Sequence, residues 1–107
     1  MPIKQLSASE LKIKIETNAD LFLLDVREPF EVAHAHISGS VPIPLNQIPK
    51  RLDEIDFEKE IVVICHHGMR SMQAANFLAQ VGFRNISNLV GGVDAWSVEC
   101  DSSVPRY

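Results

Sequence analysis

The sequence predicts an α/β fold in which a mainly parallel central sheet is flanked by helices. Two observations support this prediction. Residues 21–26 and 61–64 are short, almost continuous apolar runs, which is typical of strands covered on both faces. Residues 69–81 have helical character and follow the second run after a short loop. Strands that alternate with helices through short connections favour a parallel sheet.

The first half of the chain contains one helix-start motif and two segments whose regular structure is limited by proline. Ser7 and Glu10 form the S-x-x-E pattern of a capping box, which predicts a helix start near Ser7. The following apolar residues alternate as in a strand, which leaves a strand as the alternative. Residues 41–44 read V-P-I-P and predict an extended segment that its prolines confine to an edge or to the end of a strand. Apolar residues at helical spacing follow over 45–55, where Pro49 must shorten or split a helix.

In the second half of the chain, predicted helices and strands alternate more clearly. The helix predicted over 69–81 has Gly82 as its C-terminal stop. Residues 85–89 predict a further strand. Gly91 and Gly92 then predict a turn before a short helix that carries Trp96, which we expect to be a core residue.

Length and composition limit the class of protein. The chain has 107 residues without a repeat or linker, so we expect residues 1–107 to form one domain. Hydrophobic residues make up 46% and charged residues 22%, which argues against intrinsic disorder. The net charge of −4 argues against nucleic acid or an anionic membrane as a partner.

The same features predict where the protein works. No apolar run approaches the roughly 20 residues of a membrane span. The N-terminus lacks the basic and apolar regions of a signal peptide, and two cysteines are too few for a disulfide scaffold. We therefore expect a cytoplasmic protein. As a separate expectation, we take it to be a monomer.

The carboxyl ends of the predicted strands indicate the functional site, because ligands of parallel sheets bind there. Cys65 directly follows the apolar run 61–64. A short loop leads from it into the helix and contains His66, His67, Gly68, Met69, Arg70 and Ser71. Backbone N–H groups of such a loop can surround one atom, and the helix dipole adds to their effect. We therefore expect an accessible Cys65 whose thiolate form is favoured.

A simpler interpretation of the same loop is structural. A cysteine at the end of a strand is often a small buried hydrophobic residue. His66 and His67 would then be solvated loop residues, and Gly68 would only supply a left-handed turn.

The loop resembles a known active site. C-H-H-G-M-R-S at 65–71 is similar to the C-x-x-G-x-R-S loop of rhodanese domains. The other motifs of that family follow in order over nearly the whole chain. They are D-V-R-E at 25–28, A-H-I-S-G-S-V-P-I-P at 35–44, Gly-Phe at 82–83 and G-G-V-D-A-W at 91–96. The sequence departs from the family at Ala35, Ser38 and Ser40, where Gly, Pro and Ala are usual. These changes leave the cysteine loop untouched.

The resemblance implies a sulfurtransferase. Cys65 would take the outer sulfur of a donor such as thiosulfate and carry it as a persulfide to cyanide or to a thiol. Arg70 would hold the anionic donor, and the backbone from His66 to Ser71, including Gly68 and Met69, would stabilise charge on sulfur. No metal and no organic cofactor is expected. The histidines and cysteines lack the spacing of a zinc site.

Residues outside the loop have less specific predictions. Asp25 and Arg27 either brace the Cys65 loop or form an ion pair and a helix cap before Pro29, and we favour the second interpretation. His36 is either a general acid or base or, as the resemblance to rhodanese domains implies, a residue that bonds to backbone, and we favour the second. His34 is expected to be exposed. Acidic neighbours should keep the thiol of Cys100 protonated. A resolving role for Cys100 is the alternative.

Two other functions compete with sulfur transfer to a small acceptor. Phosphatases of similar fold have a C-x5-R loop, whereas Cys65 and Arg70 are separated as C-x4-R, which suits one sulfur atom better than a phosphoryl group. The second is a relay module that passes sulfur to a protein such as a sulfur carrier, or merely binds one. Residues 104–107 are similar to the end of rhodanese modules of enzymes that activate sulfur carriers. A purely structural module would more readily have lost Cys65 or Arg70.

Overall fold

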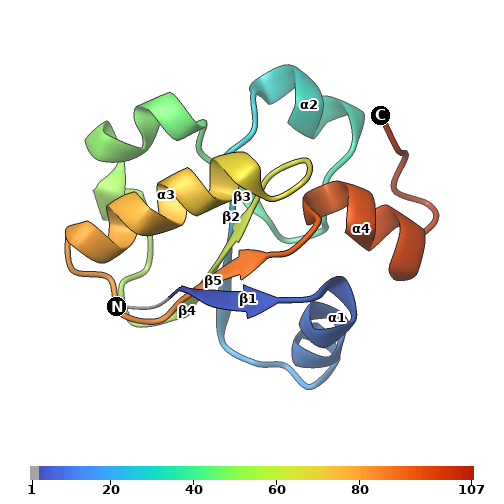
Figure 1. Cartoon of the computed structure of the whole chain (residues 1–107), viewed down its shortest axis with the longest axis horizontal. Coiled ribbons are helices and arrows are strands. Elements are labelled where there is room, and N and C mark those ends of the chain that lie inside the picture. Colours follow the sequence, from blue (N-terminus) through green and yellow to red (C-terminus); the bar gives the residue numbers. More distant parts are fainter. Residues whose placement is uncertain (1–2) are drawn as a thin grey trace.

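A five-stranded sheet forms the centre of the molecule, and every strand in it is parallel to its neighbours. The computed structural model describes residues 3–107. The strand order is β1-β5-β4-β2-β3, with helices on both faces (Figure 1). The strands are β1 (Lys4–Leu6), β2 (Leu21–Asp25), β3 (Val41–Pro42), β4 (Glu60–Ile64) and β5 (Ile86–Leu89). The helices are α1 (Ala8–Glu16), α2 (Pro29–His34), α3 (Met69–Gln80) and α4 (Gly92–Glu99). The predicted α/β fold with a parallel sheet is confirmed.

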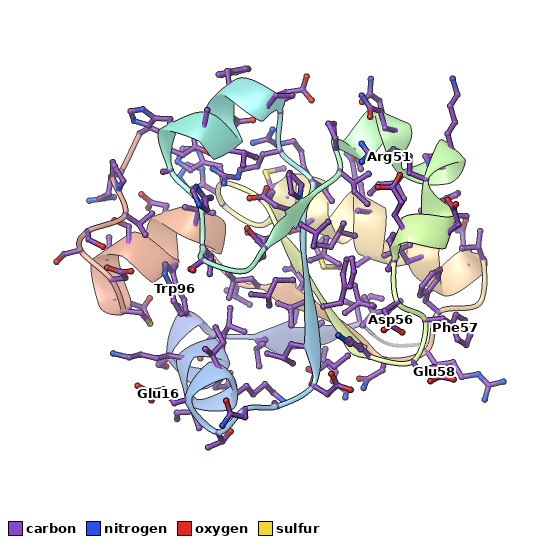
Figure 2. All side chains as sticks on the ribbon, turned by 180° about the vertical axis from the view of Figure 1, so that it is seen from behind. Glu16, Arg51, Asp56, Phe57, Glu58 and Trp96 are labelled. Carbon is purple, nitrogen blue, oxygen red and sulfur yellow. The ribbon has the colours of Figure 1, made fainter. Side chains whose placement is uncertain are left out.

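The alternation of side chains along β4 divides the core into two layers. Ile61 and Val63 pack in the layer beneath α3, whereas Val62 and Ile64 pack in the layer beneath α1 and α4. This is the two-residue period of a strand that is covered on both faces. Trp96 lies between α4 and α1 and is 8% exposed (Figure 2). Its predicted place in the core is confirmed.

The helix signal near Ser7 is also confirmed. The Ser7 hydroxyl accepts a hydrogen bond from the Glu10 amide at 3.1 Å, and the Ser7 amide donates to the Glu10 carboxylate at 2.8 Å. The strand alternative for this segment is wrong. Ile13 and Ile15 produced the alternating pattern, and both lie exposed on α1.

Residues 45–55 form two short 3₁₀ helices, Leu45–Lys50 and Leu52–Glu54, in place of one longer helix. Pro49 lies inside the first of them, and the chain breaks at Arg51. The predicted split is confirmed. The predicted edge strand is also present as β3, which pairs with β2 alone at the end of the sheet.

β1 has no counterpart in the sequence prediction. Its three residues pair with Ser87, Asn88 and Leu89, so its extended form depends on a strand near the other end of the chain. The C-terminal segment turns back from α4 toward α2 (Figure 1). Within residues 3–107, no helix combines the length and the apolar character that crossing a bilayer requires.

Candidate active site around Cys65

Cys65 lies where β4 ends, with its sulfur turned into the molecule. The Gly68 amide donates a hydrogen bond to Sγ at 2.9 Å. The thiol in turn donates to the Ser71 hydroxyl at 3.3 Å, and that hydroxyl donates to the side chain of Asn88. Two loop residues that the sequence indicated, Gly68 and Ser71, therefore contact the sulfur directly. Asn88 is a third partner that the sequence analysis missed, and β5 supplies it.

Burial corrects one expectation about this cysteine. Cys65 is 1% exposed and packs in the layer beneath α3, so the expected accessibility is wrong. The burial matches the simpler interpretation of a small core residue. A core thiol does not need an amide donor, however, and the Gly68 contact distinguishes Cys65 from one. Gly68 has φ of +108° and is the residue from which α3 begins, so the sulfur lies at the positive end of that helix.

The start of α4 holds the backbone of the cysteine loop by hydrogen bonds. The amides of Val93 and Asp94 donate to the carbonyl oxygens of Cys65 and His66, at 2.8 and 3.1 Å. Gly92 makes this contact sterically feasible. A Cβ atom at that position would lie 2.2 Å from the Cys65 oxygen and 2.4 Å from the His66 oxygen. The predicted Gly91-Gly92 turn is confirmed, and its close approach to the loop explains the second glycine.

Arg70 is engaged by an acidic residue that the sequence analysis missed. Its two Nη atoms donate to the two carboxylate oxygens of Glu31 at 2.6 and 2.8 Å. Glu31 belongs to α2 and is 7% exposed. The hydrogen bonds from Arg70 lower the pKa of this carboxyl to about 2, against the opposing effect of burial. No local pattern marked Glu31, because its partner lies 39 positions away.

The residues Asp25 and Arg27 form a buried ion pair. Arg27 donates to both carboxylate oxygens of Asp25, at 2.6 and 2.9 Å, and both residues are fully buried. Arg27 also donates to the Ala35 carbonyl at 2.6 Å and to the hydroxyl of Tyr107 at 2.6 Å. The ion-pair prediction is confirmed. The accompanying cap prediction is wrong, because Glu28 is the N-cap of α2.

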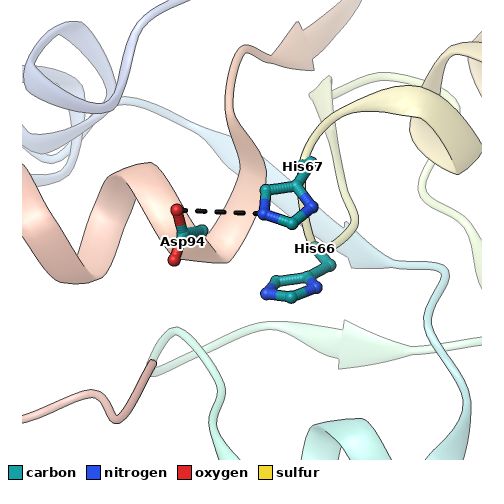
Figure 3. Close-up of side chains that lie close together, drawn as sticks. All are labelled: His66, His67 and Asp94. Carbon is teal, nitrogen blue, oxygen red and sulfur yellow. Dashed lines mark ion pairs between the residues drawn. The ribbon is translucent and has the colours of Figure 1, made fainter. Parts of the chain in front are cut away.

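The side chains of His66 and His67 form a stack with Tyr107. The ring centroids of His66 and Tyr107 are 3.9 Å apart, and their ring planes differ by 6°. The ring centroids of His66 and His67 are also 3.9 Å apart, with ring planes that differ by 29°. His67 approaches Asp94 at 3.9 Å (Figure 3), and Arg106 holds the same carboxylate at 2.8 Å. Burial and the charge of His67 lower the pKa of His66, so this ring is neutral at pH 7.

This cluster does not have the geometry of a metal site. The candidate ligand atoms of His66, His67 and Asp94 lie within 4.8 Å of one another. Metal ligands need lone pairs that converge on one point. The rings of His66 and His67 are stacked on each other instead, and Arg106 already neutralises Asp94.

The other predicted residues lie outside the sulfur's immediate contacts. Met69 is 81% exposed. His36 contacts the Val32 carbonyl at 3.2 Å, as predicted, and His34 is exposed against the edge of Tyr107. Burial is the main cause that raises the pKa of Cys100, and nearby acidic groups add to it against the opposing charge of Lys12, so its thiol is protonated as predicted. Cys100 packs against the layer opposite that of Cys65, and a resolving role for it gains no support.

Comparison with known proteins places the chain in a family. YtwF of Bacillus subtilis (strain 168) is 43% identical over 99 residues, which cover 92% of this chain and 95% of YtwF. Thiosulfate sulfurtransferase GlpE of Haemophilus influenzae is 30% identical over 106 residues, which cover 98% of this chain and 95% of GlpE. The crystal structure of a rhodanese-related protein from Thermoplasma volcanium superposes with a TM-score of 0.82 at 35% identity. The superposition covers 91% of this chain and 93% of that protein. The model of the rhodanese-like domain matches residues 7–99. The chain belongs to the rhodanese-like domain family.

Proposed function

We propose that this protein is a sulfurtransferase that carries a sulfane sulfur as a persulfide on Cys65. One observation carries the proposal: the Gly68 amide, at the N-terminus of α3, donates directly to the Cys65 sulfur. A donor in this place stabilises negative charge on the thiolate and on the persulfide. The similarity to GlpE, which is named a thiosulfate sulfurtransferase, supports the same chemistry.

The proposed cycle has two steps. The Cys65 thiolate attacks the outer sulfur of thiosulfate, the S–S bond of the donor breaks, and sulfite leaves with the bonding electron pair. Cyanide or a thiolate then attacks the outer sulfur of the persulfide, which returns the Cys65 thiolate and releases thiocyanate or a new persulfide. A thiol on a sulfur-carrier protein is an acceptor of the same kind.

The contribution of each loop residue follows from its contacts. Gly68 donates to the sulfur, and Ser71 accepts from the thiol and is oriented by Asn88. Donor binding by Arg70, His66, His67 and Met69 stays a prediction. The guanidinium of Arg70 is occupied by Glu31 in this structure.

Mass spectrometry of the intact protein and its peptides tests the proposal. Incubation with thiosulfate should add one sulfur atom to the Cys65 peptide and none to the Cys100 peptide. Cyanide should remove this sulfur and form thiocyanate. Cys65→Ser should abolish both steps, because a hydroxyl does not form a persulfide. Cys100→Ser is the matched control and should keep full turnover.

Two outcomes contradict the proposal. Sulfur that appears on Cys100, or turnover that survives Cys65→Ser, shows that Cys65 is not the carrier. Hydrolysis of an aryl phosphate by the wild type, lost in Cys65→Ser, would favour the phosphatase alternative.

A further inference from the structure

We propose that Glu31 determines which sulfur donors the Cys65 loop accepts, by cancelling the charge of Arg70 and so disfavouring the dianion thiosulfate. The preferred donor is then a less charged one, an organic persulfide R–S–SH. This inference rests on the proposed function. In the corresponding step, the Cys65 thiolate attacks the terminal sulfur of R–S–SH, the S–S bond breaks, and the thiolate RS⁻ leaves.

The ion pair between Arg70 and Glu31 has the geometry of a permanent contact. Its two parallel bonds are the bidentate arrangement in which guanidinium and carboxylate bind most strongly. The carboxylate is also held by the Glu28 amide at 3.1 Å and by the Tyr107 hydroxyl at 3.0 Å. With four donors on one carboxylate, Glu31 is held beside Arg70, and an incoming anion would have to compete with it for the guanidinium.

Two other pairs of ionic groups near the loop compensate each other. Arg27 is paired with Asp25, and Asp94 with Arg106. The His66 ring is neutral at pH 7. The Cys65 sulfur itself accepts a hydrogen bond from one amide and lies at the N-terminus of α3. These partial charges suit the single charge of a thiolate or persulfide, and they do not match the two charges of thiosulfate.

Glu31→Gln is the variant that tests this charge. A glutamine keeps an oxygen for Arg70 and for the Glu28 amide, but it leaves the guanidinium uncompensated. We expect the KM for thiosulfate to fall roughly three- to tenfold, as one unscreened charge near a surface site predicts. The KM for the hydropersulfide of N-acetylcysteine amide, which has no carboxylate, should change less than about twofold.

Glu28→Gln is the matched control. It removes the same charge from the same turn of α2, and Glu28 is exposed. Its KM for thiosulfate should stay close to that of the wild type. A residue with a merely structural role would lower turnover with both donors when replaced, and it would not improve thiosulfate binding.

The wild type provides a second test that does not depend on the folding of a variant. An uncompensated cationic site binds a dianion less tightly as salt increases. We expect the KM of the wild type for thiosulfate not to rise between low and high ionic strength, whereas that of Glu31→Gln should rise.

The outcomes separate this inference from the proposed function. If neither donor forms a persulfide on Cys65, the proposed function fails. If both donors form it, a thiosulfate KM that is unchanged or higher in Glu31→Gln overturns the role of Glu31 alone. A thiosulfate KM of the wild type that rises steeply with salt does the same.

Discussion

Tyr107 lies flat against His66, with ring centroids 3.9 Å apart and ring planes 6° apart. The hydroxyl of the same tyrosine accepts from Arg27 at 2.6 Å and donates to Glu31 at 3.0 Å. One side chain of the C-terminal segment thus joins the cysteine loop to the buried ion pair and to α2. The ring and the hydroxyl contribute separately, so substitutions can distinguish them.

We expect Tyr107→Phe to lower the free energy of unfolding by about 1 kcal/mol, because the hydroxyl bonds are lost. Tyr107→Ala should lower it by about 2 kcal/mol, because the stack on His66 is lost as well. Urea unfolding measures both values. Arg106→Ala removes an exposed ion pair of the same segment and should lower the free energy of unfolding less than Tyr107→Phe does. Equal losses for Tyr107→Phe and Tyr107→Ala would show that the stack contributes nothing.

The Arg70–Glu31 pair should make stability depend on acid. The pKa of Glu31 is lowered from 4.5 to about 2 in the folded protein. As the pH falls, the Glu31 carboxylate is therefore protonated in the unfolded chain before it is protonated in the folded protein. The stabilisation is therefore complete above pH 4.5 and is lost as the pH falls toward 2. We expect the wild type to exceed Glu31→Gln by about 2–3 kcal/mol at pH 7 and by progressively less below pH 4.5. Chemical unfolding at a series of pH values measures this difference, and a difference independent of pH would refute the explanation.

Gly92 and Gly82 allow the steric contact behind the loop to be tested against backbone strain. Both have positive φ, of +59° and +109°, but a Cβ atom at Gly82 meets nothing within 4 Å. Gly82→Ala should therefore cost about 1–2 kcal/mol, for strain alone. Gly92→Ala should cost at least about 3 kcal/mol and reduce sulfur transfer, because the new methyl group displaces the Cys65 and His66 carbonyls. Similar losses in unfolding experiments on the two variants would count against this close approach.

The buried pair of Arg27 and Asp25 should be far more important for stability than an exposed pair. Arg27→Met leaves the carboxylate of Asp25 buried without its partner, and we expect a loss of about 3–5 kcal/mol. Arg51 pairs with Glu54 at the surface, and Arg51→Met should lower the free energy of unfolding far less than Arg27→Met does. Thermal and urea unfolding of the two variants give the comparison. A loss below about 1 kcal/mol for Arg27→Met would mean that water or another group compensates Asp25.

Local patterns were sufficient to predict most of the fold. β2 and β4 are apolar runs, and α1 begins at a capping box, so each of these elements is encoded within a few residues. β1 was missed because nothing in Lys4–Leu6 favours a strand until β5 lies beside it. Residues 45–55 have a helical pattern, yet Pro49 and tertiary packing produce 3₁₀ turns.

The candidate site shows the same division. Cys65, Gly68 and Ser71 are neighbours in the sequence, and their spacing predicts that they meet. Glu31 and Tyr107 contact the site from elements far along the chain, and no local pattern records such contacts. The pairing of Arg70 with Glu31 was therefore not predicted, and donor binding by Arg70 stays a prediction.

The pairing of β1 with β5 has a consequence for the order of events on the ribosome. Gln5 accepts a hydrogen bond from Asn88, 83 positions later, and Asn88 in turn orients the hydroxyl beside the Cys65 sulfur. While the chain is being synthesised, β1 has no strand to pair with until β5 has emerged. Closing so long a loop is also entropically costly. The environment of the sulfur is therefore completed late in synthesis, after β2 and β4 are already available to pair.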